Sequence, residues 1–135
     1  MLFLSYLFFN IVYHYDGFLF FPGVKAKTSK QPDKVKIFCF EPFKENVAML
    51  KCNKPFTIHV EYANYGRTSV KECPSAKGQT ETTTCNTFAE RYTEDMRQKC
   101  GGKRSCKYSF PQPHLGRPCP EVRKYLEVRY QCKSK

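Results

Sequence analysis

Apolar and polar residues alternate over residues 56–63 (FTIHVEYA). The apolar positions run from Phe56 to Tyr62, and polar side chains such as His59 fall between them. A period of two residues is typical of a strand with one buried and one solvated face. We therefore expect a strand here, and a shorter one just before it at residues 50–52.

The same alternation returns near the end of the chain, at residues 125–132 (YLEVRYQC). The apolar side chains from Leu126 to Tyr130 share one face, which predicts a closing strand. Between the two strand patterns, residues 64–67 (NYGR) predict a turn in which Gly66 supplies an unusual φ angle.

A helix is predicted only over about residues 86–99. Phe88, Tyr92 and Met96 recur every fourth residue and form one apolar stripe, which we interpret as core and not as a ligand platform. The pair of glycines at 101–102 ends the pattern.

Eight cysteines in a chain of 135 residues indicate a disulfide framework formed in an oxidising compartment. Zinc is the alternative, but no two cysteines have the CxxC-like spacing that structural zinc sites use. We expect one small α+β domain with an antiparallel β-sandwich-like core, one main helix and long loops stapled by disulfides. The cysteines are Cys39, Cys52, Cys73, Cys85, Cys100, Cys106, Cys119 and Cys132.

The first 26 residues are apolar and aromatic, and residues 24–26 (VKA) offer a small-x-small cleavage site. This layout predicts a signal peptide at 1–26. Asp16 and the lack of an early base count against it, and a retained signal anchor or a misplaced start remains an alternative. Asp16 also argues against a stable membrane span.

Residues 27–36 (KTSKQPDKVK) are polar and predict a flexible leader, which places the domain at 37–133. Residues 74–84 (PSAKGQTETTT) predict a polar loop, either plainly solvated or carrying O-linked sugar on its threonines.

The chain carries 23 Lys and Arg against 12 Asp and Glu, a net charge of +11. Such an excess attracts polyanions at long range. In an oxidising extracellular setting we expect sulfated glycans or anionic cell surfaces and no nucleic acid, although the charge is also compatible with a role in solubility alone.

Catalytic motifs are absent from the sequence. After the expected cleavage only His59 and His114 remain, and neither belongs to a nucleophile–base pattern. No pair of acids is singled out for glycosidase chemistry. We expect a protein that is not an enzyme and that needs no cofactor or metal.

Four segments stand in a distinctive order: residues 63–67 (ANYGR), 100–106 (CGGKRSC), 117–126 (RPCPEVRKYL) and 128–132 (VRYQC). Together they resemble the rhamnose-binding, or SUEL-type, lectin domain, which also occurs in latrophilin-type adhesion receptors and in nematode guidance receptors of the EVA type. The resemblance covers about residues 39–132.

The resemblance implies a disulfide connectivity, which eight cysteines alone leave open among 105 pairings. Independently, Gly101 and Gly102 permit the tight reversal that the last of these pairs requires. The implied pairs are Cys39–Cys73, Cys52–Cys132, Cys85–Cys119 and Cys100–Cys106.

The resemblance also implies sugar-contacting residues. In sugar-binding members a tyrosine and a lysine of these motifs surround the pyranose, and Tyr65 and Lys124 stand at those positions. A glutamate follows the first cysteine in the family, whereas here Phe40 takes that place and Glu41 comes one residue later.

Two motif positions carry a different chemistry in this chain. Arg117 stands where the family has an aspartate, and Glu121 stands where it has a glycine, so that an acceptor has become a cation. These departures favour an extracellular recognition module, secreted, for a sulfated or anionic glycan or a cell-surface glycoprotein. The basic residues that would contact such a heparin-like partner are Lys99, Lys103, Arg104, Lys107, Arg117, Arg123 and Lys124.

The alternative is a lectin for neutral L-rhamnose or D-galactose that uses Tyr65, Lys124 and Glu41. A disulfide-rich secreted inhibitor or toxin is a remote alternative.

Overall fold

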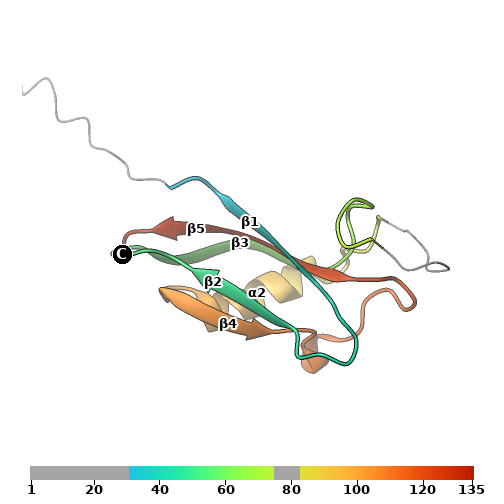
Figure 1. Cartoon of the computed structure of the whole chain (residues 1–135). Helices are drawn as coiled ribbons and strands as arrows, with labels where there is room; N and C mark the ends of the chain where they lie inside the picture. The colour runs from blue at the N-terminus through green and yellow to red at the C-terminus, as the bar shows by residue number, and fades with distance from the viewer. Residues whose placement is uncertain (1–30, 75–82) are drawn as a thin grey trace, which may run out of the picture.

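A computed structural model describes residues 31–74 and 83–135 of the chain (Figure 1). Its long strands run lengthwise beside one helix. In chain order the elements are β1 (Lys34–Cys39), β2 (Val47–Lys51), β3 (Thr57–Gly66), α2 (Ala89–Cys100), β4 (Ser105–Ser109), a 3-10 turn (Pro113–Leu115) and β5 (Tyr125–Lys133).

The strands form two antiparallel sheets, one with the order β1-β5-β3 and one with the order β2-β4. Helix α2 packs against β3 and β4. The predicted α+β class, with antiparallel sheets, one helix and four disulfides, is confirmed.

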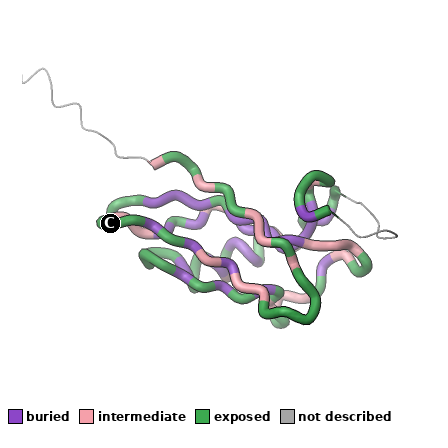
Figure 2. The backbone as a smooth tube through the Cα atoms, viewed as in Figure 1, coloured by how far each residue is buried: buried purple, intermediate pink, exposed green. Residues whose placement is uncertain are grey.

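The core lies between the two sheets and the helix, and the buried stretches of Figure 2 follow β5, β3 and α2. Tyr92 and Met96 of the helical stripe are fully buried, as predicted. The helix begins at Ala89 and not near residue 86, because the backbone N–H of Ala89 closes a turn onto the carbonyl of Asn86.

The predicted alternation of β3 fails at its middle. The pairing with β5 shifts register between Val60 and Tyr62, which is the signature of a β-bulge. Beyond it, Ala63 and Tyr65 face the core, whereas Tyr62 lies opposite Arg129 and is only partly buried. The extra residue of the bulge therefore exchanges the core-facing and solvent-facing positions that strict alternation predicts for the rest of the strand.

The turn predicted at 64–67 is wrong, because β3 continues through Gly66. The φ angle of Gly66 is not positive, so the residue does not need the left-handed backbone that glycine allows. Gly66 is needed for a close approach: a Cβ atom there would lie 2.0 Å from the carbonyl oxygen of Cys85. Arg67 then pairs with Cys85 in an isolated antiparallel bridge.

Strand β1 was not anticipated. It begins at Lys34, inside the segment 27–36 that the sequence assigns to a leader, and pairs with β5 along its whole length. The signal peptide expected at 1–26, residues 27–30 of the leader and residues 75–82 of the polar loop lie outside the described residues.

Four disulfides cross-link the domain, and they are the pairs that the family resemblance implies. Two of them hold the loops at the end of the sheets where β5 begins, and one joins the far ends of β2 and β5. They are Cys39–Cys73, Cys85–Cys119, Cys52–Cys132 and Cys100–Cys106.

Candidate functional site

A cavity of about 520 Å³ opens where β3 ends and β5 begins. Its walls come from the segment after β1, from β3 and from the long connection between β4 and β5. The disulfides at Cys39 and Cys119 hold two of these segments. The lining residues are Phe40, Tyr65, Pro111, Gly116, Arg117, Pro118, Pro120 and Lys124.

Tyr65 belongs both to the core and to the wall of this cavity. Its ring lies 6.1 Å from that of Phe40 and 5.9 Å from that of Phe110, measured between centroids. Its hydroxyl makes no hydrogen bond with a residue in the described part of the chain. Burial raises the pKa of Tyr65, so the hydroxyl stays protonated and is available to donate.

Lys124 brings a fixed cation into the same cavity. Its Nζ donates to the carbonyl oxygens of Cys119 (3.0 Å) and Val122 (3.1 Å) and lies 5.9 Å from the centroid of the Tyr65 ring. An ammonium group has three donors, so one remains for a ligand. Burial lowers the pKa of Lys124, because desolvation penalises its charged form.

Arg117 and Glu121, the two departures from the family pattern, have different positions. Arg117 is exposed and lines the cavity, and it forms no ion pair with any described residue. Glu121 is exposed but is not part of the lining, and its φ of 66° keeps the left-handed backbone that a glycine would adopt easily. The charge of Arg117 therefore faces the cavity, whereas the side chain of Glu121 leaves it open.

The structure does not bring Glu41 to Tyr65 and Lys124. Glu41 lines a separate cavity of about 340 Å³ beside β1 and β2, where it pairs with Lys44. The hydrogen bond and the charge of Lys44 lower the pKa of Glu41. Phe40, which sequence reasoning did not select, contributes to the main cavity in its place.

The predicted basic residues do not form one patch. The backbones of Lys103 and Arg104 bond to Ile58 and Cys52, at the end of the molecule where β3 begins. Lys107 is exposed in the middle of β4. Arg117, Arg123 and Lys124 lie at the opposite end, and Lys99 is occupied by an ion pair with Asp95 (2.9 Å).

Arg67 acts inside the structure and not at its surface. Its guanidinium is fully buried and donates to the carbonyl oxygens of Cys73 (3.1 Å) and Arg123 (3.0 Å). It therefore ties the segment after β3 to the segment that carries Lys124. The sequence predicted a turn at this residue. In the structure its hydrogen bonds join the end of β3 to the segments that contain Cys73 and Arg123.

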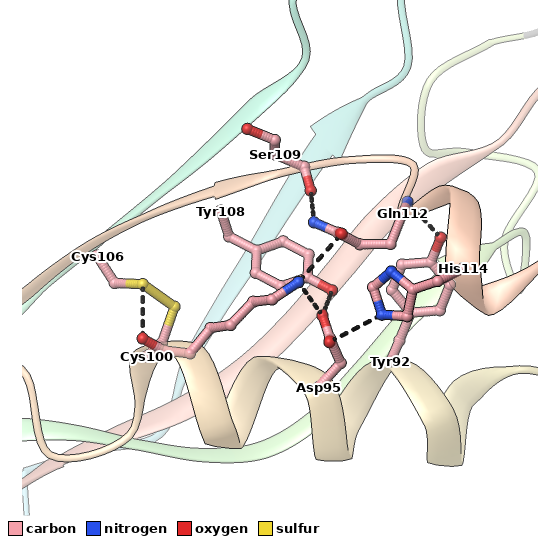
Figure 3. Close-up of polar contacts among 9 residues, drawn as sticks. Tyr92, Asp95, Cys100, Cys106, Tyr108, Ser109, Gln112 and His114 are labelled. Atoms are coloured by element: carbon pink, nitrogen blue, oxygen red, sulfur yellow. Dashed lines mark hydrogen bonds and ion pairs between the residues drawn. A yellow bond between two sulfur atoms is a disulfide. The ribbon is translucent and has the colours of Figure 1, made fainter.

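A polar cluster that the sequence did not reveal anchors the cavity wall to the helix (Figure 3). Asp95 of α2 accepts a hydrogen bond from the Tyr108 hydroxyl (2.6 Å) and lies 3.1 Å from Nε2 of His114. The Tyr92 hydroxyl accepts from the backbone N–H of Gln112 (3.1 Å). These contacts fix the segment 111–116, whose two ends line the cavity. No motif in the linear sequence points to them.

Within residues 31–74 and 83–135, no three His, Cys, Asp or Glu side chains are grouped so as to hold a metal ion. In the same residues no helix has the length and apolar character needed to cross a membrane.

Comparison with known proteins gives a match over most of the described chain. The family model for the D-galactoside/L-rhamnose binding SUEL lectin domain matches residues 50–132. Adhesion G protein-coupled receptor L1 is 36% identical over 83 residues in both Mus musculus and Homo sapiens, covering 62% of this chain and 6% of each receptor. Latrophilin Cirl of Drosophila mojavensis is 35% identical over 85 residues, 63% of this chain and 5% of that protein. The chain thus corresponds to only a small part of the curated relatives it matches.

Proposed function

This chain belongs to the D-galactoside/L-rhamnose binding SUEL lectin domain family, and from that premise we propose that it is an extracellular recognition domain without catalytic activity. Its ligand is a carbohydrate group that enters the cavity beside Tyr65 and Lys124. Members of the family are binding modules, and the four disulfides suit an oxidising compartment. The relatives are named as adhesion receptors, so we propose a cell-surface glycoprotein as the carrier of the sugar.

The preferred ligand in this proposal is an anionic sugar, one that bears a sulfate or a carboxylate. The observation that carries this choice is Arg117 in the cavity lining beside Lys124, with no acidic side chain among the described residues of that lining. Two cations without acidic partners on one wall favour a negatively charged group. The rings of Phe40 and Tyr65 supply an apolar surface for the sugar face.

A neutral sugar is the second candidate, and it also has a specific observation in its favour. The Tyr65 hydroxyl and one donor of Lys124 are free to bond to ring hydroxyls. Glu121 does not close the cavity, so the loss of the family glycine does not block a pyranose. In this case Arg117 would bond to a sugar hydroxyl or turn towards solvent.

Calorimetry with a matched ligand pair separates the two candidates. We expect D-galactose 6-sulfate to bind at least about tenfold more tightly than D-galactose or L-rhamnose, and increasing salt to weaken only the sulfated ligand. In Arg117→Asp, which restores the acid of the family pattern, the preference should disappear or reverse.

Arg104→Asp is the matched control, because it makes the same charge change at an exposed arginine at the other end of the molecule. It should leave the preference intact. Salt-insensitive binding of a neutral monosaccharide to the wild type, equal to that of the sulfated sugar and lost in Lys124→Ala, would reject the anionic ligand and favour the neutral one.

A further inference from the structure

A third cavity lies between β1 and β2, separate from the sugar cavity at Tyr65 and from the smaller cavity at Glu41. Its volume is about 490 Å³, and both strands are at the edges of their sheets and are not hydrogen-bonded to each other. The β1–β2 groove, as we call it, lies near Tyr130 of β5, whereas Tyr65 of the first cavity pairs with Leu126 near the start of that strand. The lining residues are Lys34, Val35, Lys36, Met49, Lys51, Asn53 and Tyr130.

Lysines stand on both walls of this groove. Lys34 is the cross-strand partner of Tyr130, and Lys36 is the partner of Val128. Tyr130 and Val128 face the core, and directly paired residues share one face of a sheet, so both lysines point to the core side of β1. They are two positions apart in the sequence, about 7 Å along the strand. Lys51 supplies a cation from β2 on the other wall.

These charges are not neutralised locally. None of the three lysines forms an ion pair with a residue that the structure describes. Among the residues that the structure describes, no acid lines the groove, and the neighbouring carboxylate of Asp33 accepts a hydrogen bond from the Gln131 amide. Lys107 does not line the groove, but as the cross-strand partner of Met49 it carries a further positive charge on the same face of the second sheet.

The walls of the groove are held in place before any ligand binds. The Lys34 ammonium lies 5.8 Å from the centroid of the Tyr130 ring, and the Tyr130 hydroxyl donates to the carbonyl oxygen of Lys51 (3.3 Å). The next residue after Lys51 forms the Cys52–Cys132 disulfide. Little ordering of the backbone is therefore required on binding, which lowers the entropic cost.

Protection of an edge strand explains part of this arrangement but not all of it. Inward-pointing lysines on an edge discourage pairing with another chain, which accounts for Lys34 and Lys36 on β1. It does not explain why lysines of two different sheets converge on one cavity: Lys51 lies on β2, which is itself an edge strand, and lines the same groove as Lys34 and Lys36.

We propose that the β1–β2 groove binds a segment of a sulfated glycan chain, with sulfate groups at Lys34, Lys36 and Lys51. The cations are spread along the groove and over both walls, so a chain with repeated charges fits them better than one isolated anion. A single-stranded nucleic acid would need exposed aromatic rings on which bases stack. Within residues 31–74 and 83–135 the only ring in the lining is that of Tyr130, and it is 2% exposed. This site does not depend on the sugar cavity at Tyr65.

The test is calorimetry of the whole protein with a heparin-derived hexasaccharide. The variant Lys34→Gln/Lys36→Gln/Lys51→Gln removes three charges from the groove. The control Lys44→Gln/Lys71→Gln/Arg91→Gln removes three charges from exposed positions outside it. Three screened contacts predict a loss of about tenfold to a hundredfold in the groove variant, with a smaller salt dependence, and less than about threefold in the control.

Equal losses in the two variants would overturn the proposal, because they would show a response to net charge alone. Equally tight binding of a single-stranded DNA oligomer of similar charge would overturn the choice of a glycan. If the triple variant does not fold, Lys36→Gln/Lys51→Gln, which changes two exposed side chains, takes its place with the same expected direction.

Galactose 6-sulfate distinguishes this site from the proposed sugar cavity. The groove variant should bind the monosaccharide as the wild type does, and Arg117→Asp should keep most of its affinity for the hexasaccharide. Loss of affinity for both the hexasaccharide and galactose 6-sulfate, in a groove variant with the wild-type melting temperature, would contradict the proposal that the two ligands bind at separate sites.

Discussion

Tyr65 combines a packing role with a candidate binding role. Mutation can test its hydroxyl group separately from its ring. Tyr65→Phe removes only a hydroxyl that has no hydrogen bond to a described residue. The free energy of unfolding should therefore change by less than about 1 kcal/mol. Sugar affinity should fall about fivefold to tenfold, which is the value of one lost hydrogen bond, measured by calorimetry.

Tyr65→Ala is the companion variant, and it should cost about 3–5 kcal/mol of stability because a large core ring is removed. If Tyr65→Phe bound sugar as tightly as the wild type, the hydroxyl would have no part in recognition and Tyr65 would be a core residue only.

Gly66 shows how one residue can be needed for steric reasons rather than for its φ angle. In Gly66→Ala the new Cβ would meet the Cys85 carbonyl oxygen at 2.0 Å, and that oxygen belongs to the backbone, so the two segments must separate. We expect a loss of more than about 3 kcal/mol in chemical unfolding.

Gly102→Ala provides the contrast. Its Cβ would meet nothing within 4 Å, but its φ is +76°, so only the conformational cost of about 1–2 kcal/mol applies. A larger loss in Gly102→Ala than in Gly66→Ala would refute the steric explanation.

Among the elements, α2 contributes to the site through the Asp95 cluster more than through its apolar stripe. Burial on its own would raise the pKa of Asp95, but hydrogen bonds from Tyr108, Lys99 and His114 and the charge of Lys99 lower it overall. A carboxyl with a lowered pKa stabilises the fold above its unfolded value of 3.8, and this contribution is lost as the pH falls through the folded value.

Asp95→Asn should therefore be less stable than the wild type by about 1–3 kcal/mol at pH 7, and the difference should shrink towards pH 2. Urea unfolding at both pH values measures it. Glu94→Gln is the control on the same helix, because Glu94 is exposed and, among the described residues, its side chain bonds only to Gln98. A difference that is equally large at pH 2 would show that the carboxylate charge of Asp95 is not what stabilises the cluster.

The elements also show where periodicity succeeds and where it fails. The apolar face of β5 and most of the stripe of α2 were predictable, because the apolar side chains from Leu126 to Tyr130 and Tyr92 with Met96 are buried, whereas Phe88 precedes the helix and is only partly buried. Two features were not: β1, whose KVKIFC sequence mixes lysines with apolar residues, and the bulge in β3. Both depend on pairing with β5, which lies between these two strands. The local sequence of a strand does not show which distant strand it pairs with.

At the scale of the whole molecule, long-range information came from the order of the motifs and cysteines. Those motifs placed Tyr65 and Lys124, which do line one cavity. They misplaced Glu41, because the chain after Cys39 turns Phe40 towards Tyr65 and leaves Glu41 beside β2. The basic residues were grouped by proximity in sequence, whereas the fold separates Lys103 from Arg117 and unites lysines of β1 and β2 that are distant in the chain.

The disulfides permit a test of how cross-links stabilise a domain of this size. Cys52–Cys132 closes a loop of 80 residues and Cys100–Cys106 a loop of 6, while the four sulfur-bearing side chains are about equally buried. If the constraint acts on the unfolded chain, its value grows with loop length, from about 2 kcal/mol for the short loop to about 4.5 kcal/mol for the long one. Paired Cys→Ala variants should differ by about that amount in guanidinium unfolding, because the cost of lost burial is similar in both. Equal losses would mean that strain or residual structure in the unfolded chain, and not loop entropy, sets the contribution of each bridge.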